Sequence, residues 1–196
     1  MLIVYDGLRW FVILTDDFTR FIWMFFMKIK DKMIKHIKNF VTLMKTDCSA
    51  YSLKCLCINF KYKYLVLKNW FSVNGIIWEP TMPYSSKENG VSEQLNGTIC
   101  ESAQAMLKDF GLNSHLWSKV IKTAVYIKNQ SSTCVLDMTS YEAWTGNVSD
   151  LSSLHIFDII AWAHIFKKWR QQEVKFEDHS LKCHYLGMKE SSIFHV

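Results

Sequence analysis

The sequence has few of the residues that interrupt regular structure: two prolines and seven glycines among 196 residues. No repeats or low-complexity linkers are found either. Long apolar runs are also missing. The longest, at residues 10–14 and 21–27, are too short to cross a bilayer, and a charged turn separates them. The sequence therefore predicts a chain without repeats and without a membrane-spanning segment.

A secretory signal is not recognisable, because residues 1–5 carry no basic lead and their apolar run stops at Asp6. We therefore expect an intracellular protein, with the nucleus as one location, whose six cysteines are reduced thiols. Cys55-x-Cys57 would place two side chains on one face of a strand, and Cys183 is followed directly by His184. Neither pattern has the paired CxxC or HxxxH spacing of a zinc site, so structural cysteines are favoured and no metal site is predicted.

The composition is that of a globular domain with an appreciable core. Hydrophobic residues make up 49% of the chain and aromatic residues 15%, which excludes a disordered protein. The formal net charge of +5 permits a nucleic-acid partner but does not require one, since many globular domains carry as much.

The order of apolar patterns predicts an α/β protein that begins with an antiparallel hairpin. Its strands are expected at residues 8–15 and 21–28, and Asp16 and Asp17 in the connection are expected to serve the turn. Further strands are expected at residues 52–60 and at residues 76–78, the second short and buried, and helices at residues 33–44, 70–73, 91–110 and 116–129. Asn74-Gly75 predicts the end of the helix at residues 70–73. The residues expected to face inward are Met33, Ile37, Phe40, Val41 and Met44 on the first helix, Val91, Leu95, Ile99, Ala103, Met106 and Phe110 on the third, and Trp117, Val120, Ala124 and Ile127 on the fourth. From about residue 150, short apolar runs alternate with turns and basic residues, which predicts a small β module.

A polar loop at residues 80–90 is predicted to lead into the clearest helix, with Glu93 in its first turn. The helix dipole favours a carboxylate there, which is one explanation of Glu93. The other is metal-dependent phosphoryl transfer, in which two cations about 3.5–4 Å apart steady the attacking and leaving oxygens. Holding two such hard cations takes roughly three converging carboxylates, of which Glu93 would be one.

Several motifs in combination resemble the integrases of copia-type retrotransposons. Trp10-Phe11, residues 13–20 and Trp23 resemble the second strand of that family. Residues 74–76, 83–85 and 89–93, with Asn96, resemble its glutamate motif. Further matches follow in the same order: Met106-Leu107, Leu112, Trp117, Ala124-Val125-Tyr126, Asn129, and residues 141–146 and 151–157. The resemblance covers essentially the whole chain.

The resemblance implies a ribonuclease H-like fold over residues 1–148, a mixed five-stranded sheet flanked by helices whose first strand is truncated here. It implies an incomplete SH3-like β module over residues 150–196. The implied activity is insertion of element DNA into a chromosome by part of a Pol polyprotein. Active members hold Mg²⁺ or Mn²⁺ with two aspartates and one glutamate. Glu93 matches that glutamate. The implied partners are DNA, bound weakly here, and further copies of the chain in a homo-oligomer.

The two family aspartates are not matched. The first belongs on a strand further before Trp10 than the nine residues that precede it here. The second belongs at the position of Asn59, which is neutral and is followed by Lys61 and Lys63. No aspartate occurs between Asp47 and Asp109, so no shift of register supplies one. We therefore expect no metal cofactor on this chain and no catalysis. The third hypothesis, an active enzyme, requires a partner chain that supplies both aspartates.

The candidate nucleic-acid-binding residues are Lys87, Asn89, Asn96, Lys167, Lys168 and Arg170. The family helix usually carries arginines that meet DNA, and Gln94, Gly97 and Gln104 stand in their places. Phosphate contacts supply most of the affinity for nucleic acid, so binding is expected to be weak and salt-dependent. The second hypothesis is a non-catalytic DNA- or protein-binding module that uses this residual basic surface. The alternative explanation of these cations is ordinary solvated surface charge.

Overall fold

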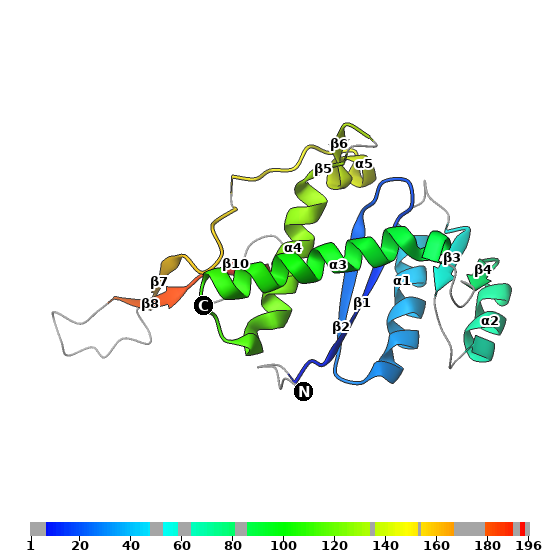
Figure 1. Cartoon of the computed structure of the whole chain (residues 1–196), viewed down its shortest axis with the longest axis horizontal. Helices are drawn as coiled ribbons and strands as arrows, with labels where there is room; N and C mark the ends of the chain where they lie inside the picture. The colour runs from blue at the N-terminus through cyan, green and yellow to red at the C-terminus, as the bar shows by residue number, and fades with distance from the viewer. Residues whose placement is uncertain are drawn as a thin grey trace. The chain divides into compact units, whose positions relative to one another are not determined.

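The computed structural model describes residues 7–47, 53–58, 64–80, 86–133, 136–152, 154–166, 179–189 and 193–194 (Figure 1). This part of the chain is mixed α/β, as the sequence predicts. It divides into two compact units. One contains residues 14–24 and the residues from 99 onward, and the other contains residues 7–13 and 25–98. The first hairpin and the longest helix each contribute residues to both units.

The predicted hairpin is present as β1 (Trp10–Thr15) and β2 (Ile22–Met27), which are hydrogen-bonded to each other. The backbone N–H of Asp16 donates to the carbonyl of Phe21 at 3.0 Å. The N–H of Arg9 donates to the carbonyl of Met27, also at 3.0 Å. The start of β1 is thus paired with the end of β2, and the end of β1 with the start of β2, so the two strands are antiparallel.

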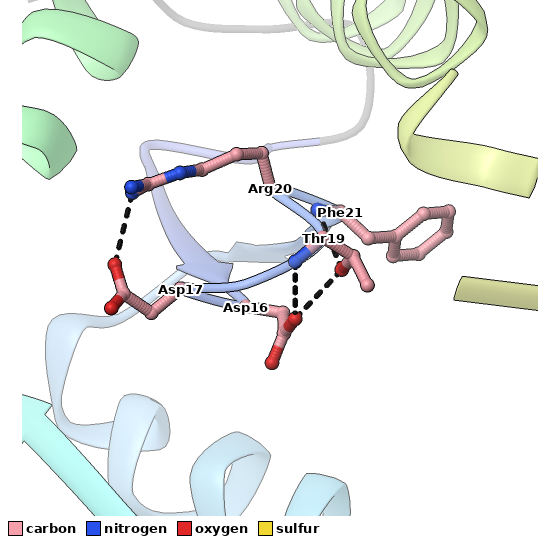
Figure 2. Close-up of polar contacts among 5 residues, drawn as sticks. All are labelled: Asp16, Asp17, Thr19, Arg20 and Phe21. Atoms are coloured by element: carbon pink, nitrogen blue, oxygen red, sulfur yellow. Dashed lines mark hydrogen bonds and ion pairs between the residues drawn. The ribbon is translucent and has the colours of Figure 1, made fainter. Parts of the chain in front are cut away.

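The turn between these strands is held by its own side chains (Figure 2). Asp16 Oδ2 accepts hydrogen bonds from the backbone N–H and from Oγ1 of Thr19, both at 2.7 Å. The Asp17 carboxylate pairs with the guanidinium of Arg20 at 3.0 Å. Arg20 adopts a left-handed φ of 61°, a conformation that a tight turn imposes. The prediction that both aspartates serve the turn is confirmed.

Residues 25–98 contain a small apolar core between two helices and a pair of strands. The helices are α1 (Met33–Asp47), preceded by the 3-10 turn η1 (Lys30–Lys32), and α2 (Tyr64–Val73). The strands are β3 (Cys55–Ile58) and β4 (Ile77–Pro80). The core side chains are Ile37, Val41, Leu67, Phe71 and Ile76. The amphipathic pattern predicted for α1 is therefore confirmed.

The strands β3 and β4 run parallel, with Cys55 opposite Ile77 and Cys57 opposite Glu79. The helix α2 connects them and ends before Gly75, whose φ of +69° is the left-handed conformation that glycine favours after a helix. That predicted helix end is confirmed. The prediction that residues 76–78 are wholly buried is wrong for Ile77, which is 62% exposed because alternate strand residues face away from the core.

The longest helix, α3 (Ser86–Asp109), begins earlier than the sequence predicts. Residues 86–90 were expected in a loop because of Asn89-Gly90, but they are helical. Glu93 therefore lies seven residues after the helix start, not in the first turn. Along the predicted apolar stripe, Ile99 and Ala103 are buried, whereas Val91 is 48% exposed. Within the described residues, no helix is long and apolar enough to span a membrane.

The helix α4 (Trp117–Gln130) follows the 3-10 turn η2 (Ser114–Leu116). Val120 and Ala124 are buried, as predicted. Ile127 is 42% exposed, so its predicted inward position is wrong; Ile121 and Val125 are buried instead.

Asn129, near the end of α4, joins this helix to β2. Its side-chain Oδ1 accepts from the backbone N–H of Ile22 at 2.9 Å, and its Nδ2 donates to the carbonyl of Ile22 at the same distance. Both residues are buried. The amide thus pairs with β2 as a neighbouring strand would.

Short strands and one helix follow α4. The bridge β5 (Ser132–Thr133) to β6 (Met138–Thr139) leads into α5 (Ser140–Thr145). Beyond residue 150, β7 (Ile160–His164) pairs antiparallel with β8 (Ser180–His184), and β9 (Met188–Lys189) pairs antiparallel with β10 (Ile193–Phe194). The expectation of β structure after residue 150 is confirmed in these strands.

The strand pairs of the described residues are separate: β1 with β2, and β3 with β4. A single five-stranded sheet is not among them, and the expected first strand at residues 2–5 lies outside the described residues. The five-stranded sheet and the SH3-like module remain predictions.

Candidate functional site

Glu93 lies on the exposed side of α3. Asn89 and Asn96 are four residues before and three residues after it, so helical periodicity places these three positions on one face of the helix. The predicted site residue Lys87 belongs to the same helix. The structure thus places Glu93 on one helix with three of the six candidate binding residues.

The remaining predicted site residues lie outside the described residues. These are Asn59, Lys167, Lys168 and Arg170. Their roles stay predictions.

The helix dipole no longer explains Glu93. Its influence falls off within the first turn of a helix, and Glu93 is about two turns from Ser86. This correction removes the structural explanation that sequence alone favoured. It leaves Glu93 as an exposed carboxylate on a helix whose neighbouring positions are mostly uncharged.

The described part of the chain does not place Glu93 in a group of three or more potential metal ligands. Within that part, one group of three or more histidine, cysteine or carboxylate side chains is close enough to hold an ion, and Glu93 is not a member. Gln94, Gly97 and Gln104, which the resemblance sets at the places of the family's arginines, lie on α3, and Gln94 and Gln104 are exposed. The neighbours of Glu93 at these three positions are therefore uncharged.

The one such cluster found among the described residues consists of Cys55, Cys57 and Glu79. One ligand atom from each residue lies within 4.8 Å of the others. The Sγ of Cys57 donates a hydrogen bond to Oε2 of Glu79 at 3.5 Å. Cys57 is exposed, but partial desolvation by the surrounding chain, followed by the charge of Cys55, raises the pKa of Cys57 to about 11. Burial and then the charge of Glu79 also raise the pKa of Cys55, so both groups are thiols at neutral pH.

Sequence reasoning found two of the three members of this cluster. The alternation of a strand indicates that Cys55 and Cys57 share a face. Glu79 is 22 residues further along the chain, and only the parallel register of β3 and β4 sets it opposite Cys57. The sequence therefore showed a C-x-C pattern in a strand but gave no indication that Glu79 would lie beside it.

Comparison with known proteins identifies relatives of this chain. No family model matches it. The chain is 30% identical over 183 residues to the retrovirus-related Pol polyprotein from transposon TNT 1-94 of Nicotiana tabacum. It is 24% identical over 184 residues to that from transposon RE1 of Arabidopsis thaliana. The matches cover 92% and 93% of this chain but only 14% and 12% of those polyproteins, so the chain spans a small segment of their length.

Among solved structures, the chain is similar to one chain of the cryo-EM structure of the simian T-cell lymphotropic virus intasome in complex with PP2A regulatory subunit B56 gamma. The TM-score is 0.56, and the match covers 89% of this chain and 61% of that chain. Sequence identity is 10%, so this similarity concerns the fold alone.

Proposed function

From its homology to a segment of the Pol polyproteins of copia-type retrotransposons, we propose that this chain is an integrase catalytic core-like segment that does not itself catalyse strand transfer. Its ancestral role is integration of element DNA. We propose that it no longer catalyses this reaction because it lacks carboxylates that would hold the metal ions.

The observation that carries the proposal is the residue content of one internal segment. At the position that resembles the family's second aspartate the chain has Asn59, and no aspartate occurs between Asp47 and Asp109. An asparagine brings no negative charge, and Lys61 and Lys63 add positive charge nearby in sequence. Mg²⁺ and Mn²⁺ favour carboxylate oxygens, so a pair of these ions lacks an essential ligand. The argument is independent of any residues that precede Met1 in a longer polyprotein.

The surroundings of Glu93 support the same conclusion. Glu93 is exposed, and within the described residues it belongs to no cluster of potential ligands. A single exposed carboxylate binds Mg²⁺ weakly, because the ion loses hydration without gaining enough charge in return. The residues present do not fit a two-metal centre, and we route no step of a reaction through one.

The finer architecture is part of the proposal. We assign residues 1–148 to a ribonuclease H-like core with a five-stranded sheet and residues 150–196 to an SH3-like module. The parallel β3–α2–β4 unit supports the first assignment. The antiparallel pair β7–β8 supports the second. An intracellular, including nuclear, location and self-association into a homo-oligomer complete the proposal.

Weak DNA binding is the activity that the proposal retains. The net charge of +5 favours contact with phosphates in general. On α3, however, the positions of the expected arginines are uncharged, so we expect little affinity beyond this electrostatic attraction. The second hypothesis, a dedicated DNA- or protein-binding module, depends on Lys167, Lys168 and Arg170.

An oligonucleotide assay with two readouts tests the proposal. The purified chain is incubated with element-end DNA and Mg²⁺ or Mn²⁺, and both joined products and retained DNA are measured at several salt concentrations. We expect no joining and no end processing, together with retention that disappears as salt rises. An integrase core of the same family with all three acidic residues serves as the positive control.

The Glu93→Gln variant decides how a trace of joining is interpreted. Joining that requires the metal and is abolished by Glu93→Gln would refute the proposed inactivity. Salt-dependent retention whose dependence on salt is reduced by changing Lys167, Lys168 and Arg170 to alanine would favour the binding-module hypothesis instead.

A further inference from the structure

The cluster of Cys55, Cys57 and Glu79 lies on the face of the β3–β4 pair that points away from the core. Leu56 and Trp78, the residues that alternate with cluster members, pack against the core around Phe71. Because strand side chains alternate between faces, the cluster members point to the opposite side. Cys57 and Glu79 are exposed, and Cys55 is half-buried. An ion from solvent can therefore reach all three ligand atoms.

The spacing of these atoms is close to that of a tetrahedral zinc site. Zinc–sulfur bonds of about 2.3 Å and zinc–oxygen bonds of about 2.0 Å place adjacent ligand atoms roughly 3.5–3.8 Å apart. The Cys57 sulfur and the Glu79 oxygen are 3.5 Å apart in the structure. The complete set lies within 4.8 Å, about 1 Å more than the separation that a zinc site requires.

We propose that Cys55, Cys57 and Glu79 form a binding site for a thiophilic divalent cation, with Zn²⁺ as its natural occupant. Two sulfurs and one carboxylate oxygen are the ligands of Zn²⁺, whereas Mg²⁺ takes oxygen ligands. Three protein ligands leave the fourth position of the tetrahedron for water. Zn²⁺ binding releases the protons of both thiols to solvent, and the two positive charges of the ion then offset two of the three negative charges of the two thiolates and the carboxylate.

The site is distinct from the two-metal centre of the integrase resemblance. Its ligands come from the parallel strands β3 and β4, with Cys55 as the first residue of β3, and neither cysteine nor Glu79 matches a member of the acidic triad. Its expected effect is to fasten β3 to β4, because the ion bridges residues that are 22 positions apart in sequence. The inference holds whether or not the chain catalyses strand transfer.

Zinc titration of the full, reduced chain tests this site. Binding is measured by competition with a chromophoric chelator, and Co²⁺ is substituted for Zn²⁺ so that sulfur-to-cobalt charge-transfer absorption reports thiolate ligation. We expect a site whose Kd for Zn²⁺ rises at least about 100-fold in Cys57→Ser and at least about tenfold in Glu79→Gln. Cys100→Ser removes a half-buried thiol from α3 and serves as the matched control, with unchanged affinity expected.

Far-ultraviolet circular dichroism of each variant establishes that it is folded. A rise in melting temperature with Zn²⁺ that is present in Cys100→Ser and absent in Cys57→Ser would support the site. Equal zinc affinity in Cys57→Ser, Glu79→Gln and Cys100→Ser would overturn it. So would a folded, reduced chain that shows no sulfur-to-cobalt absorption.

Discussion

Replacing Phe71 with alanine is expected to lower the free energy of unfolding by about 3–5 kcal/mol, enough to unfold much of a marginally stable chain. Phe71 on α2 is fully buried. It belongs to the core cluster with Ile37 and Val41 of α1 and with Ile76, which precedes β4. Removing the ring costs its burial energy and leaves a cavity that these neighbours fill only in part.

Urea unfolding followed by tryptophan fluorescence measures this loss, because Trp70 and Trp78 pack against the same core. The matched control is Val73→Ala on the same helix. Val73 is 87% exposed, so its truncation should change the unfolding free energy by less than about 0.5 kcal/mol. A Phe71→Ala variant as stable as Val73→Ala would show that this core does not form as described.

The second large effect is expected at Asn129. Its replacement by alanine removes both hydrogen bonds to the backbone of Ile22 and leaves a buried N–H and a buried carbonyl without these partners. Each such group costs about 1–3 kcal/mol, so we expect a loss of about 3 kcal/mol in unfolding free energy. Chemical denaturation followed by circular dichroism measures it.

Asn39→Ala is the control for Asn129→Ala. Asn39 lies on the exposed side of α1, where alanine is the better helix former, so no loss is expected. If Asn129→Ala were no less stable than Asn39→Ala, α4 would not be joined to β2 through this amide. The predicted difference between the two asparagines comes from burial and bonding, since the substitution itself is the same.

Local chemistry explains why parts of the fold were predictable from sequence. The first hairpin was predicted from two strand-forming runs joined by a short turn, and the bonds of Asp16 and Arg20 show that the turn residues satisfy the turn locally. The end of α2 was predicted from Asn74-Gly75 for the same reason. In α1, a strong apolar stripe matched the buried face, because that face packs on a single core.

The start of α3 was not predictable in this way. Asn89 and Gly90 are poor helix formers and indicated a loop, yet the helix begins at Ser86 and continues through them. Gly90 carries an ordinary helical backbone conformation, since its φ is not positive. Intrinsic preference is a small term per residue, and its sum over a 24-residue helix is not decided by two positions.

The two candidate sites also differ in how much of each could be predicted from the sequence. Glu93 was identified from a sequence motif, but its distance from the helix start required the structure. The Cys55, Cys57 and Glu79 cluster depends on the register of two parallel strands, which hydrophobic patterning does not fix across a connecting helix. Absent residues, by contrast, are fully visible in sequence: no fold supplies an aspartate to the segment between Asp47 and Asp109.

The most direct test of the central claim is the number of Mn²⁺ ions that the chain binds through Glu93. Electron paramagnetic resonance of a Mn²⁺ titration, carried out on the unmodified chain and on Glu93→Gln, counts these ions. We predict identical titrations of the two proteins. One exposed carboxylate without its two aspartate partners does not hold two Mn²⁺ ions. Two Mn²⁺ ions per chain that are both lost in Glu93→Gln would contradict the account.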